Sequence, residues 1–256
     1  MKIGGNASNN GVRFVSGNYS AKFVMRKDET YTISTDKRVI TDGKFKKLIK
    51  KIPLIRGLFA LFSAAPILII AMLPMFFVDF MPYGGEGRNI ALMAANIVSL
   101  GVLVYLIKRI LLRSGNTRQF HGAEHKTIYA FDIEMELTLE NVRSCPRVAK
   151  RCGTNLAVFM LLFFAVFSMI SGFVIEVHSS IQFLVSYAFA YELFDLKNGE
   201  KIPVIKLFFK LGNWCQQHLF TREPTDIQII ASIETVNKLI ELEEQDEGGD
   251  GSVMTA

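Results

Sequence analysis

Cysteine, histidine and tryptophan are scarce in this chain of 256 residues, which contains three cysteines, four histidines and one tryptophan. Its first eleven residues lack the apolar run of a signal peptide, so we expect no cleavage there. Internal repeats, a glycine-rich phosphate loop and a Gly-x-Ser-x-Gly nucleophile turn are also lacking, which argues against a repeat protein, a P-loop enzyme and an α/β-hydrolase.

Hydrophobic residues, by contrast, make up 50% of the chain, and the mean hydropathy is +0.28. A helix needs roughly 20 apolar residues to cross a bilayer. Residues 57–81, 89–112 and 155–175 reach that length. Residues 180–194 form a shorter run that carries Glu192, which predicts either a tilted fourth span or one arm of a re-entrant hairpin. The predicted fold class is a mainly α, polytopic membrane protein with about four transmembrane helices.

Lysine and arginine gather on one side of these predicted spans, whereas the opposite loops, residues 82–88 and 176–180, hold one arginine and none. The positive-inside rule then places both termini in the cytoplasm. The net charge of +5 reflects this topology and contact with anionic lipid, and no nucleic-acid binding is expected. Cys145, Cys152 and Cys215 fall on the cytoplasmic side, where structural disulfides are rare, so free thiols or metal ligands are expected.

The chain is predicted to consist of six segments. They are a β-rich cytoplasmic region (1–43), a basic helix over 44–56 with the first two spans (44–113), a cytoplasmic segment with His-x-x-Glu-His (114–152), the third and fourth spans (153–195), interfacial and amphipathic helices (196–244) and a disordered acidic tail (245–256).

Local signals support the two ends of this division. Residues 20–26 and 30–35 are strand-like, with Gly17-Asn18 as one turn and Lys27-Asp28-Glu29 as another. Near the other end, residues 225–228 have the capping-box pattern that begins a helix. The apolar residues of that helix recur at helical spacing. It therefore needs a partner surface, either in the same chain or on another protein.

The candidate metal site is the segment His121-Gly-Ala-Glu-His125, in which two of the four histidines lie four positions apart. On a helix these positions share a face, so both imidazoles can reach one ion. Imidazole is a common zinc ligand, and His-x-x-Glu-His is the order found in inverted zinc peptidases. A pair of this kind is more often two surface residues, so further ligands are required. Glu124 is the candidate general base.

Three residues are candidates to complete the metal site. Cys152 is either a ligand or a half-buried small residue at the mouth of the third span. Cys145 shares a helical face with Cys152 if Pro146 begins a helix that continues into that span. Glu192 is costly in an apolar run, so it is either a ligand or the partner of a cation such as Lys197 or Arg151.

Five motifs occur in an order that resembles a known family. They are Phe120-His-Gly-Ala-Glu-His-Lys126, Leu139-Glu-Asn-Val-Arg143, Arg151-Cys-Gly-Thr154, Tyr191-Glu192 and Thr221-Arg-Glu-Pro224. Over residues 4–239 the chain resembles the YqhQ-like family of bacterial membrane proteins of unknown function, often labelled predicted metal-dependent enzymes. The resemblance implies a multi-pass protein of the inner membrane, and it supplies no substrate.

The chain departs from that family pattern at two places. Asn10 stands where the family has a glutamate before a Gly-Val pair, and Ala149-Lys150 stands where the family has His-Pro before Arg-Cys-Gly-Thr. The resemblance therefore implies that a histidine and a glutamate able to bind metal or to catalyse are absent. Either Cys145 takes over a ligand role, or the chain is a divergent member with weakened chemistry.

Two functions follow from these observations. In the first, the protein is a scaffold or accessory subunit of a membrane complex, with the lipid bilayer and another membrane protein as partners and a metal that pins its cytoplasmic segment. In the alternative, it is a zinc-dependent membrane hydrolase acting on membrane peptides or lipid-linked substrates, with zinc on His121 and His125 and with Cys152 or Glu192 completing the site. The lost histidine and glutamate favour the scaffold.

Overall fold

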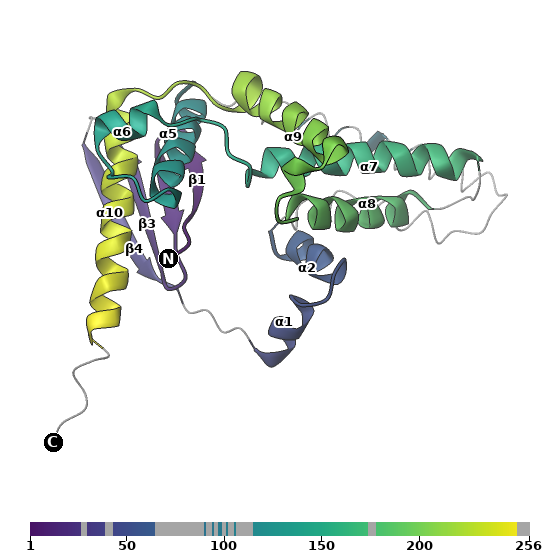
Figure 1. The fold of residues 1–256 in the computed structure, drawn as a ribbon, viewed down its shortest axis with the longest axis horizontal. Coiled ribbons are helices and arrows are strands. Elements are labelled where there is room, and N and C mark those ends of the chain that lie inside the picture. Colours follow the sequence, from purple (N-terminus) through teal and green to yellow (C-terminus); the bar gives the residue numbers. More distant parts are fainter. Residues whose placement is uncertain are drawn as a thin grey trace. The chain divides into compact units, whose positions relative to one another are not determined.

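The structure, a computed structural model, describes residues 1–26, 30–38, 43–64, 115–173 and 178–249 and six single positions between residues 90 and 105. The chain divides into two compact units, each assembled from segments distant in sequence (Figure 1). The first unit contains Met1–Thr41, Leu112–Ala149 and Cys215–Ala256, and the second contains Asp42–Leu111 and Lys150–Trp214. The described part is mainly helical, with one antiparallel sheet near the N-terminus.

The sheet of the first unit is a four-stranded meander in the order β1-β2-β3-β4. Its strands are β1 (Gly4–Ser8), β2 (Gly11–Val15), β3 (Tyr19–Met25) and β4 (Tyr31–Lys37). The predicted strands at 20–26 and 30–35 and the turn at Gly17-Asn18 are confirmed, whereas the turn predicted at 27–29 lies outside the described residues. Strand β1 was not predicted because glycine and asparagine are poor strand formers, and its pairing with β2 stabilises it.

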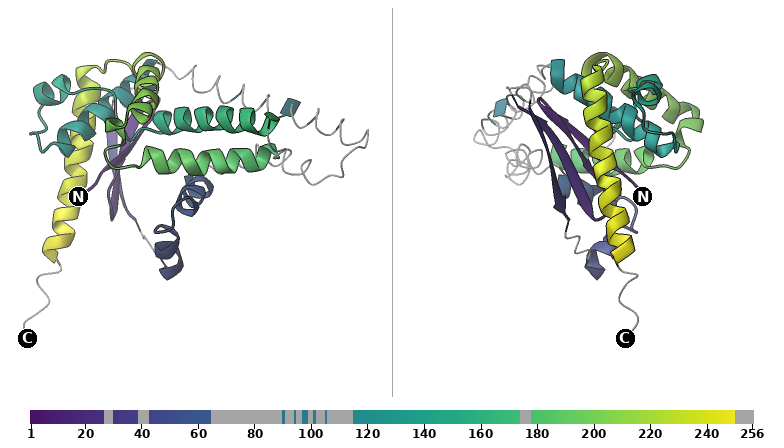
Figure 2. Two further views of the ribbon diagram at one scale, coloured as in Figure 1. Left: turned by 45° about the vertical axis from the view of Figure 1, so that its right-hand side comes forward. Right: turned by 90° about the vertical axis from the view of Figure 1, so that its left-hand side faces the viewer.

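Helices α5 (Gly115–Asp132) and α10 (Asp226–Gly249) cover one face of this sheet, and Figure 2 shows α10 lying across the strands. Apolar side chains alternate along β2 and β3 so that Phe14 and Phe23 point to this face, where they meet Phe120 of α5. Full burial of a side chain of this size stabilises the fold by roughly 2 kcal/mol. The partner surface that α10 requires is thus supplied by the same chain.

Both ends of α10 are held by polar contacts. The Thr225 backbone N–H donates to Gln228 Oε1 over 2.9 Å, which confirms the predicted capping box. The predicted start of the acidic tail, residue 245, is too early in the chain, because helix α10 continues to Gly249. The last turns of α10 are bound to the sheet, where Glu243 accepts a hydrogen bond from Asn18 over 3.0 Å and Asp246 pairs with Lys37 over 2.9 Å. Residues 250–256 lie outside the described part.

The predicted basic helix over residues 44–56 is wrong as a single element. It is two helices, α1 (Lys44–Ile49) and α2 (Ile55–Ala64). Pro53 lacks the N–H that a helix requires and disfavours helical geometry in the residue before it. Leu54 then takes a positive φ of 66°, which redirects the chain into α2.

The second unit contains a pair of apolar helices, α7 (Gly153–Phe173) and α8 (Ser179–Phe194), together with α9 (Pro203–Cys215) up to Trp214. The π-helical turn η2 (Gln216–Phe220) follows α9 in the chain and belongs to the first unit. A 3-10 turn, η1 (Gly199–Lys201), precedes α9. Phe159, Ala190, Ile205 and Phe209 form the apolar core among these helices. The helices predicted over 155–175 and 180–194 are therefore present, and α9 is one of the helices predicted within 196–244.

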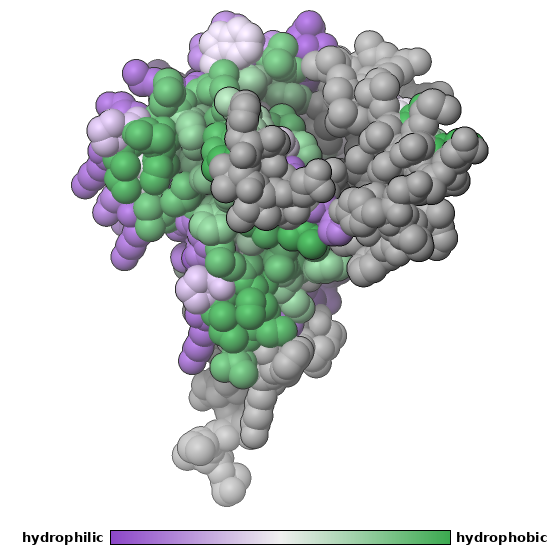
Figure 3. Space-filling model, turned by 90° about the vertical axis from the view of Figure 1, so that its right-hand side faces the viewer, coloured by the Kyte–Doolittle hydropathy of each residue, from purple (hydrophilic) through white to green (hydrophobic). Residues whose placement is uncertain are grey.

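Within the described part of the chain, one helix is long and apolar enough to cross a membrane, over Gly153–Ile170 of α7. Only 17% of that window is buried, unlike the core helix of a soluble protein. Figure 3 shows apolar side chains gathered on the face seen from the end where α7 stops and α8 begins. Much of the first predicted span and nearly all of the second lie outside the described residues. Of the other two, the third is this helix, whereas α8, the predicted fourth, has 16 residues and is shorter than a full crossing requires.

Candidate metal centre

His121 and His125 lie one helical turn apart on α5, and their ring centroids are 4.3 Å from each other. The two rings meet edge to face, at 61°. This placement follows from the helical repeat, because residues i and i+4 share a face. The imidazoles are therefore close enough for a single ion to contact both.

Backbone carbonyls orient both rings. His125 Nδ1 lies 2.8 Å from the Arg147 oxygen, and His121 Nδ1 lies 3.1 Å from the Phe220 oxygen. A carbonyl oxygen only accepts, so each Nδ1 carries a proton, and Nε2 is the nitrogen of each ring that could bind an ion. Metal-binding histidines use the same arrangement, in which a hydrogen bond on one nitrogen fixes the tautomer and the direction of the other.

Burial keeps the His125 ring neutral. Its side chain is 4% exposed, and desolvation, followed by the proximity of His121, lowers the pKa of His125 to about 4. The hydrogen bond to Arg147 opposes this shift without reversing it. A neutral imidazole at physiological pH is the form that coordinates a metal, so protons do not compete with an ion for His125 Nε2.

Glu124 lies at the junction of α5 and β1. It is 6% exposed, and a Cβ placed on Gly5 would lie 2.6 Å from the Glu124 Oε1 atom. Any side chain at position 5 would therefore displace this carboxylate. Gly5 of β1 therefore leaves the space that the Glu124 side chain occupies. The spacing of residues in the sequence does not reveal this contact.

Lys126, the residue after His125, and Arg147, whose carbonyl is bonded to His125, share one carboxylate. Lys126, with a side chain 5% exposed, donates to the Arg143 carbonyl over 2.7 Å and pairs with Glu223 over 2.7 Å. Arg147 pairs with the other Glu223 oxygen over 2.8 Å. Although burial opposes ionisation, these two hydrogen bonds hold the pKa of Glu223 below its ordinary value. A buried lysine is tolerated because its charge is paired and hydrogen-bonded.

The corner Thr221–Pro224 packs directly on α5. The Arg222 backbone N–H donates to the Arg118 carbonyl over 2.9 Å, and a Cβ on Gly122 would overlap the Arg222 carbonyl oxygen. Gly122 is therefore required for close approach rather than for helix formation. Sequence reasoning missed Glu223 and Arg147 as parts of the site, and the recurrence of Thr-Arg-Glu-Pro among the family motifs was the signal that could have found Glu223.

The segment after α6 (Leu139–Ser144) is held by a buried amide. Gln216 accepts from the Ala149 N–H over 3.0 Å and donates to the Ala149 carbonyl over 3.1 Å. The helix predicted from Pro146 into the third span is wrong, because residues 145–152 are irregular and α7 begins at Gly153. Cys145 and Cys152 therefore do not share a helical face.

Cys145 lies in an apolar cluster with Val142, Ile229 and Ile233. Its Sγ donates to the Asn141 carbonyl over 3.4 Å, and burial raises the pKa of its thiol. Metal binding requires the thiolate, so this surrounding disfavours coordination by Cys145. The structure gives this cysteine a packing role within the first unit.

The other two predicted ligands belong to the second unit. Cys152 is 9% exposed, and its Sγ lies 3.5 Å from Thr154 Oγ1 at the start of α7. Glu192 accepts from Arg56 Nε over 2.9 Å, from Arg56 Nη2 over 2.6 Å and from the Leu54 N–H over 2.9 Å. The cation that pairs with Glu192 is therefore Arg56, and neither Lys197 nor Arg151.

Comparison with known proteins agrees with the motifs. Residues 8–242 match the family described as protein of unknown function (DUF1385). The uncharacterized protein YqhQ of Bacillus subtilis (strain 168) is 31% identical over 152 residues, which cover 57% of this chain and 47% of that protein. The match thus spans about half the length of that relative. No solved structure matches the chain. With a match over nearly its whole length, the chain belongs to the DUF1385 family, of which YqhQ is a relative.

Proposed function

We propose that this protein is a multi-pass protein of the bacterial inner membrane that binds one zinc ion on its cytoplasmic side and serves as a scaffold or accessory subunit of a membrane complex. One observation carries the metal part of the proposal. Both Nδ1 atoms of His121 and His125 donate to backbone carbonyls, so Nε2 is the nitrogen that each imidazole on this helical face can offer to an ion.

Cys152 is the third ligand in this proposal. It follows Arg147, whose carbonyl is bonded to His125, by only five residues, and a chain of that length spans at most about 18 Å. Two imidazoles and a thiolate form a borderline-soft ligand set that suits zinc. Glu192 is left out because Arg56 and Leu54 already donate three hydrogen bonds to it. Cys145 is left out because it is packed among apolar side chains.

The membrane part of the proposal depends on exposed apolar residues of the second unit. On α7, Leu161 is 59% exposed and Met169 is 66% exposed, and on α9 Val204 and Leu207 are each 64% exposed. Apolar side chains can point away from the protein without a loss of stability when lipid surrounds them. The basic loops then lie in the cytoplasm by the positive-inside rule, together with both termini.

The scaffold role is favoured by how the histidines are held. Their ring nitrogens are bonded to Arg147 and Phe220, which belong to different segments, and Glu124 packs against Gly5 of β1. An ion at this point would tie together parts of the chain that are far apart in sequence. Ala149 stands where the family pattern has a histidine, and its side chain has no group that can bind a metal. Its backbone N–H and carbonyl are hydrogen-bonded to the Gln216 side chain.

A zinc-dependent membrane hydrolase is the second candidate, and the burial of Glu124 beside the two histidines favours it. A zinc-bound water has its pKa lowered toward neutrality, and a neighbouring carboxylate can accept its proton. The substrates would be membrane peptides or lipid-linked compounds at the cytoplasmic interface.

The test is the zinc content of detergent-purified protein, measured by mass spectrometry. We expect one equivalent in the wild type and its loss in His121→Ala/His125→Ala. His178→Ala/His218→Ala is the matched control, since it removes the other two histidines of the chain, and it should keep the ion. Equal zinc in the wild type and the His121/His125 variant would refute the site.

Glu124→Gln separates the two functions. A scaffold should keep its zinc and rescue a deletion strain fully in this variant, whereas a hydrolase should keep its zinc and fail to rescue. Cobalt substitution adds a spectroscopic reading, because a catalytic ion keeps an open coordination position and a structural ion does not.

A further inference from the structure

Helix α9 has two apolar faces, one turned inward and one turned outward. The inward face carries Ile205, Phe209 and Gly212, which are buried in the second unit. The outward face carries an apolar stripe of Val204, Leu207, Leu211 and Trp214, which are 64%, 64%, 44% and 54% exposed. Their spacings of three and four positions place them on one side of the helix. The inward face explains how α9 is held, and the outward stripe needs an apolar environment of its own.

The inward face holds α9 against the first turns of α7. Asn155 Nδ2, in the first turn of α7, donates to Asn213 Oδ1 over 3.2 Å. The rings of Phe159 and Phe209 pack with their centroids 4.9 Å apart. Phe159 lies six residues after Gly153, the first residue of α7, or about 9 Å along that helix. If α7 crosses a bilayer, α9 therefore lies at the level where the crossing begins.

Lysine side chains border the outward stripe. Lys206 and Lys210 are exposed, and Lys210 lies three positions after Leu207 and four positions before Trp214, so it adjoins both. An apolar face bordered by lysines is typical of a helix that lies in the plane of a membrane surface. Protein interfaces, by contrast, are depleted in lysine. The composition of this face therefore favours lipid over another protein as its partner.

The lysines also determine the charge of the lipid that suits α9. A lysine stem can lie along an apolar surface while its ammonium group reaches the headgroups. The phosphate of an anionic lipid is the complementary group there, and each lysine near an anionic leaflet favours binding by roughly fivefold.

We infer that α9 lies in the plane of an anionic lipid leaflet, with its outward stripe among the first acyl carbons and with Lys206 and Lys210 on the lipid phosphates. The inference rests on the membrane placement proposed above, to which it adds the depth of α9 and the charge of the lipid that it binds. It is independent of the metal site.

The experiment uses Trp214, the single tryptophan of the chain, as a fluorescent reporter of the stripe. The full-length protein is reconstituted in phosphatidylglycerol vesicles that also contain phosphatidylcholine brominated either near the headgroup or near the ends of the acyl chains. The apolar face of an in-plane helix lies about 5–10 Å into the boundary between headgroups and acyl chains, so bromines near the headgroup should quench Trp214 about twofold more strongly than bromines at the chain ends.

Three results would overturn the inference. Stronger quenching by bromines at the chain ends would mean that α9 crosses the bilayer. Quenching by acrylamide in the buffer, without quenching by bromines, would mean that the stripe faces water. Protection of Trp214 from both quenchers would mean that protein, such as a second copy of this chain, covers the stripe.

The stripe itself is tested with Leu207→Gln/Leu211→Gln. Both residues are exposed, so the fold should persist, while the quenching of Trp214 by acrylamide should rise about threefold because less apolar area enters the lipid. Ile227→Gln/Ile230→Gln makes the same change at two exposed residues of α10 in the first unit and should quench as the wild type does. An equal rise in both double variants would contradict a specific role of the stripe.

The charge of the lipid is tested with the lysines. Acrylamide should quench wild-type Trp214 about twofold less in phosphatidylglycerol bilayers than in pure phosphatidylcholine. Lys206→Gln/Lys210→Gln should remove this difference, and Lys206→Arg/Lys210→Arg should retain it. Equal quenching of the wild type in the two bilayers would overturn the assignment of the lysines to anionic phosphates.

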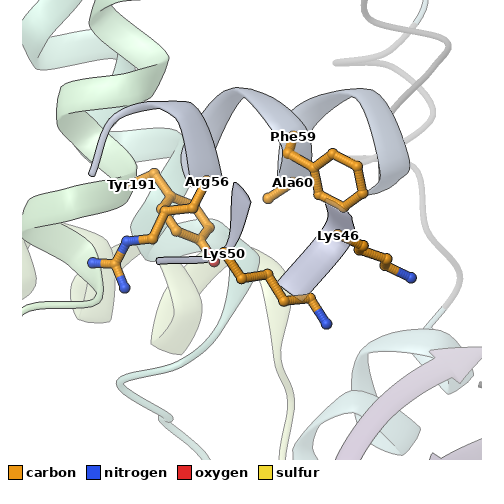
Figure 4. A pocket seen from close by; sticks show the side chains of 6 residues that line it. All are labelled: Lys46, Lys50, Arg56, Phe59, Ala60 and Tyr191. Atoms are coloured by element: carbon orange, nitrogen blue, oxygen red, sulfur yellow. The ribbon is translucent and has the colours of Figure 1, made fainter. Parts of the chain in front are cut away.

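The matched control is Lys46→Gln/Lys50→Gln, which removes two lysines of the same spacing from α1 of the same unit. Figure 4 shows their side chains extending in the same direction from that helix. This variant should keep the wild-type difference between the two lipids, and its loss in both double variants would show diffuse attraction to charge and would overturn the inference.

Failure of the membrane proposal has a different signature, since the protein would then fractionate without membranes and would not enter the vesicles. The zinc content of Lys206→Gln/Lys210→Gln should equal that of the wild type, which keeps this inference separable from the metal site.

Discussion

The two units of this protein differ most in the apolar side chains that they leave exposed. In the first unit, Phe14 and Phe23 are 0% and 2% exposed between the sheet and its helices. In the second unit, Met169 is 66% exposed on α7, whereas Asn155 and Ser186 are both fully buried. The first arrangement suits water, and the second would suit the lipid surroundings proposed above, because apolar side chains gain nothing by leaving an apolar solvent.

The contacts that hold each unit together differ accordingly. The first unit joins a hydrophobic core to charged pairs such as Lys126–Glu223. Between α7 and α8 of the second unit, Ser168 donates to Gln182 over 3.0 Å, and aromatic rings such as Phe167 and Phe189 pack 5.7 Å apart. Buried hydrogen bonds and close packing replace the hydrophobic effect when lipid surrounds the helices.

The largest effect is expected at Gly122, where two backbone segments of the first unit meet. Alanine would improve helix propensity by about 1 kcal/mol, but its Cβ would overlap the Arg222 carbonyl oxygen. We expect Gly122→Ala to lower the free energy of unfolding by about 3 kcal/mol, measured by thermal or chemical unfolding. Gly115→Ala, on the same helix, meets only Arg222 Nη1 at 3.6 Å and should be neutral or slightly stabilising.

The next effect concerns His125 in zinc-free protein. Its pKa is about 4 in the fold against 6.5 for the free side chain, so unfolded chains bind more protons between these values. The stability that neutral His125 contributes is present above pH 6.5 and is lost as the pH falls to 4. At about 1.4 kcal/mol for each pKa unit, this loss is of the order of 3 kcal/mol.

Unfolding midpoints of the zinc-free protein between pH 7 and pH 4 measure this dependence. His125→Gln should flatten the curve in that window, and His218→Gln should leave it as in the wild type. An identical slope in wild type and His125→Gln would contradict the buried neutral state and would weaken the contrast between the units.

A smaller effect is expected for the partly buried charges of the second unit. Removing Arg56 leaves Glu192, whose side chain is 19% exposed, with an uncompensated charge. We expect Arg56→Ala to lower the free energy of unfolding by about 2 kcal/mol, and Arg56→Lys to restore part of it, since lysine cannot donate in bidentate fashion. Lys150→Ala removes an exposed pair with Glu200 and should cost about 0.5 kcal/mol or less. Equal losses of stability in Arg56→Ala and Lys150→Ala would show that the Arg56–Glu192 pair contributes no more than an exposed ion pair does.

The smallest effect tests the helix pair directly. Ser168→Ala removes the hydrogen bond to Gln182 and should cost about 0.6 kcal/mol in lipid, as is typical of polar contacts between membrane helices. The neighbouring Met169→Ala should cost almost nothing, because Met169 faces outward. Unfolding of the protein in lipid nanodiscs measures both variants, and a loss of about 2 kcal/mol or more for Met169→Ala would mean that α7 is packed in a protein core.

Local patterns predicted the elements of the fold well. Strand-like residues between turn signals located β3 and β4, the capping box located the start of α10, and run length located α7 and α8. Predictions failed where a local preference was overridden. The helix expected from Pro146 does not form, because backbone groups of residues 147 and 149 bond to His125 and Gln216 instead.

The candidate site was predictable only in part. The spacing of His121 and His125 predicted a shared helical face, and the rings do lie side by side. No spacing indicated that Phe220, 99 positions away from His121, supplies the carbonyl that orients its ring. In the sequence Gly5 is only a poor strand former. In the fold its lack of a side chain leaves the space that Glu124 requires.

The sequence by itself therefore determined the helical periods, the apolar runs and the single helical face that carries both histidines, because these depend on residues within a few positions of one another. Only the tertiary structure decided which groups hold those residues: carbonyls for the histidines, Glu223 for Lys126 and Arg56 for Glu192. These pairings join distant segments. Their choice depends on burial and on the satisfaction of each charge, which no local pattern records.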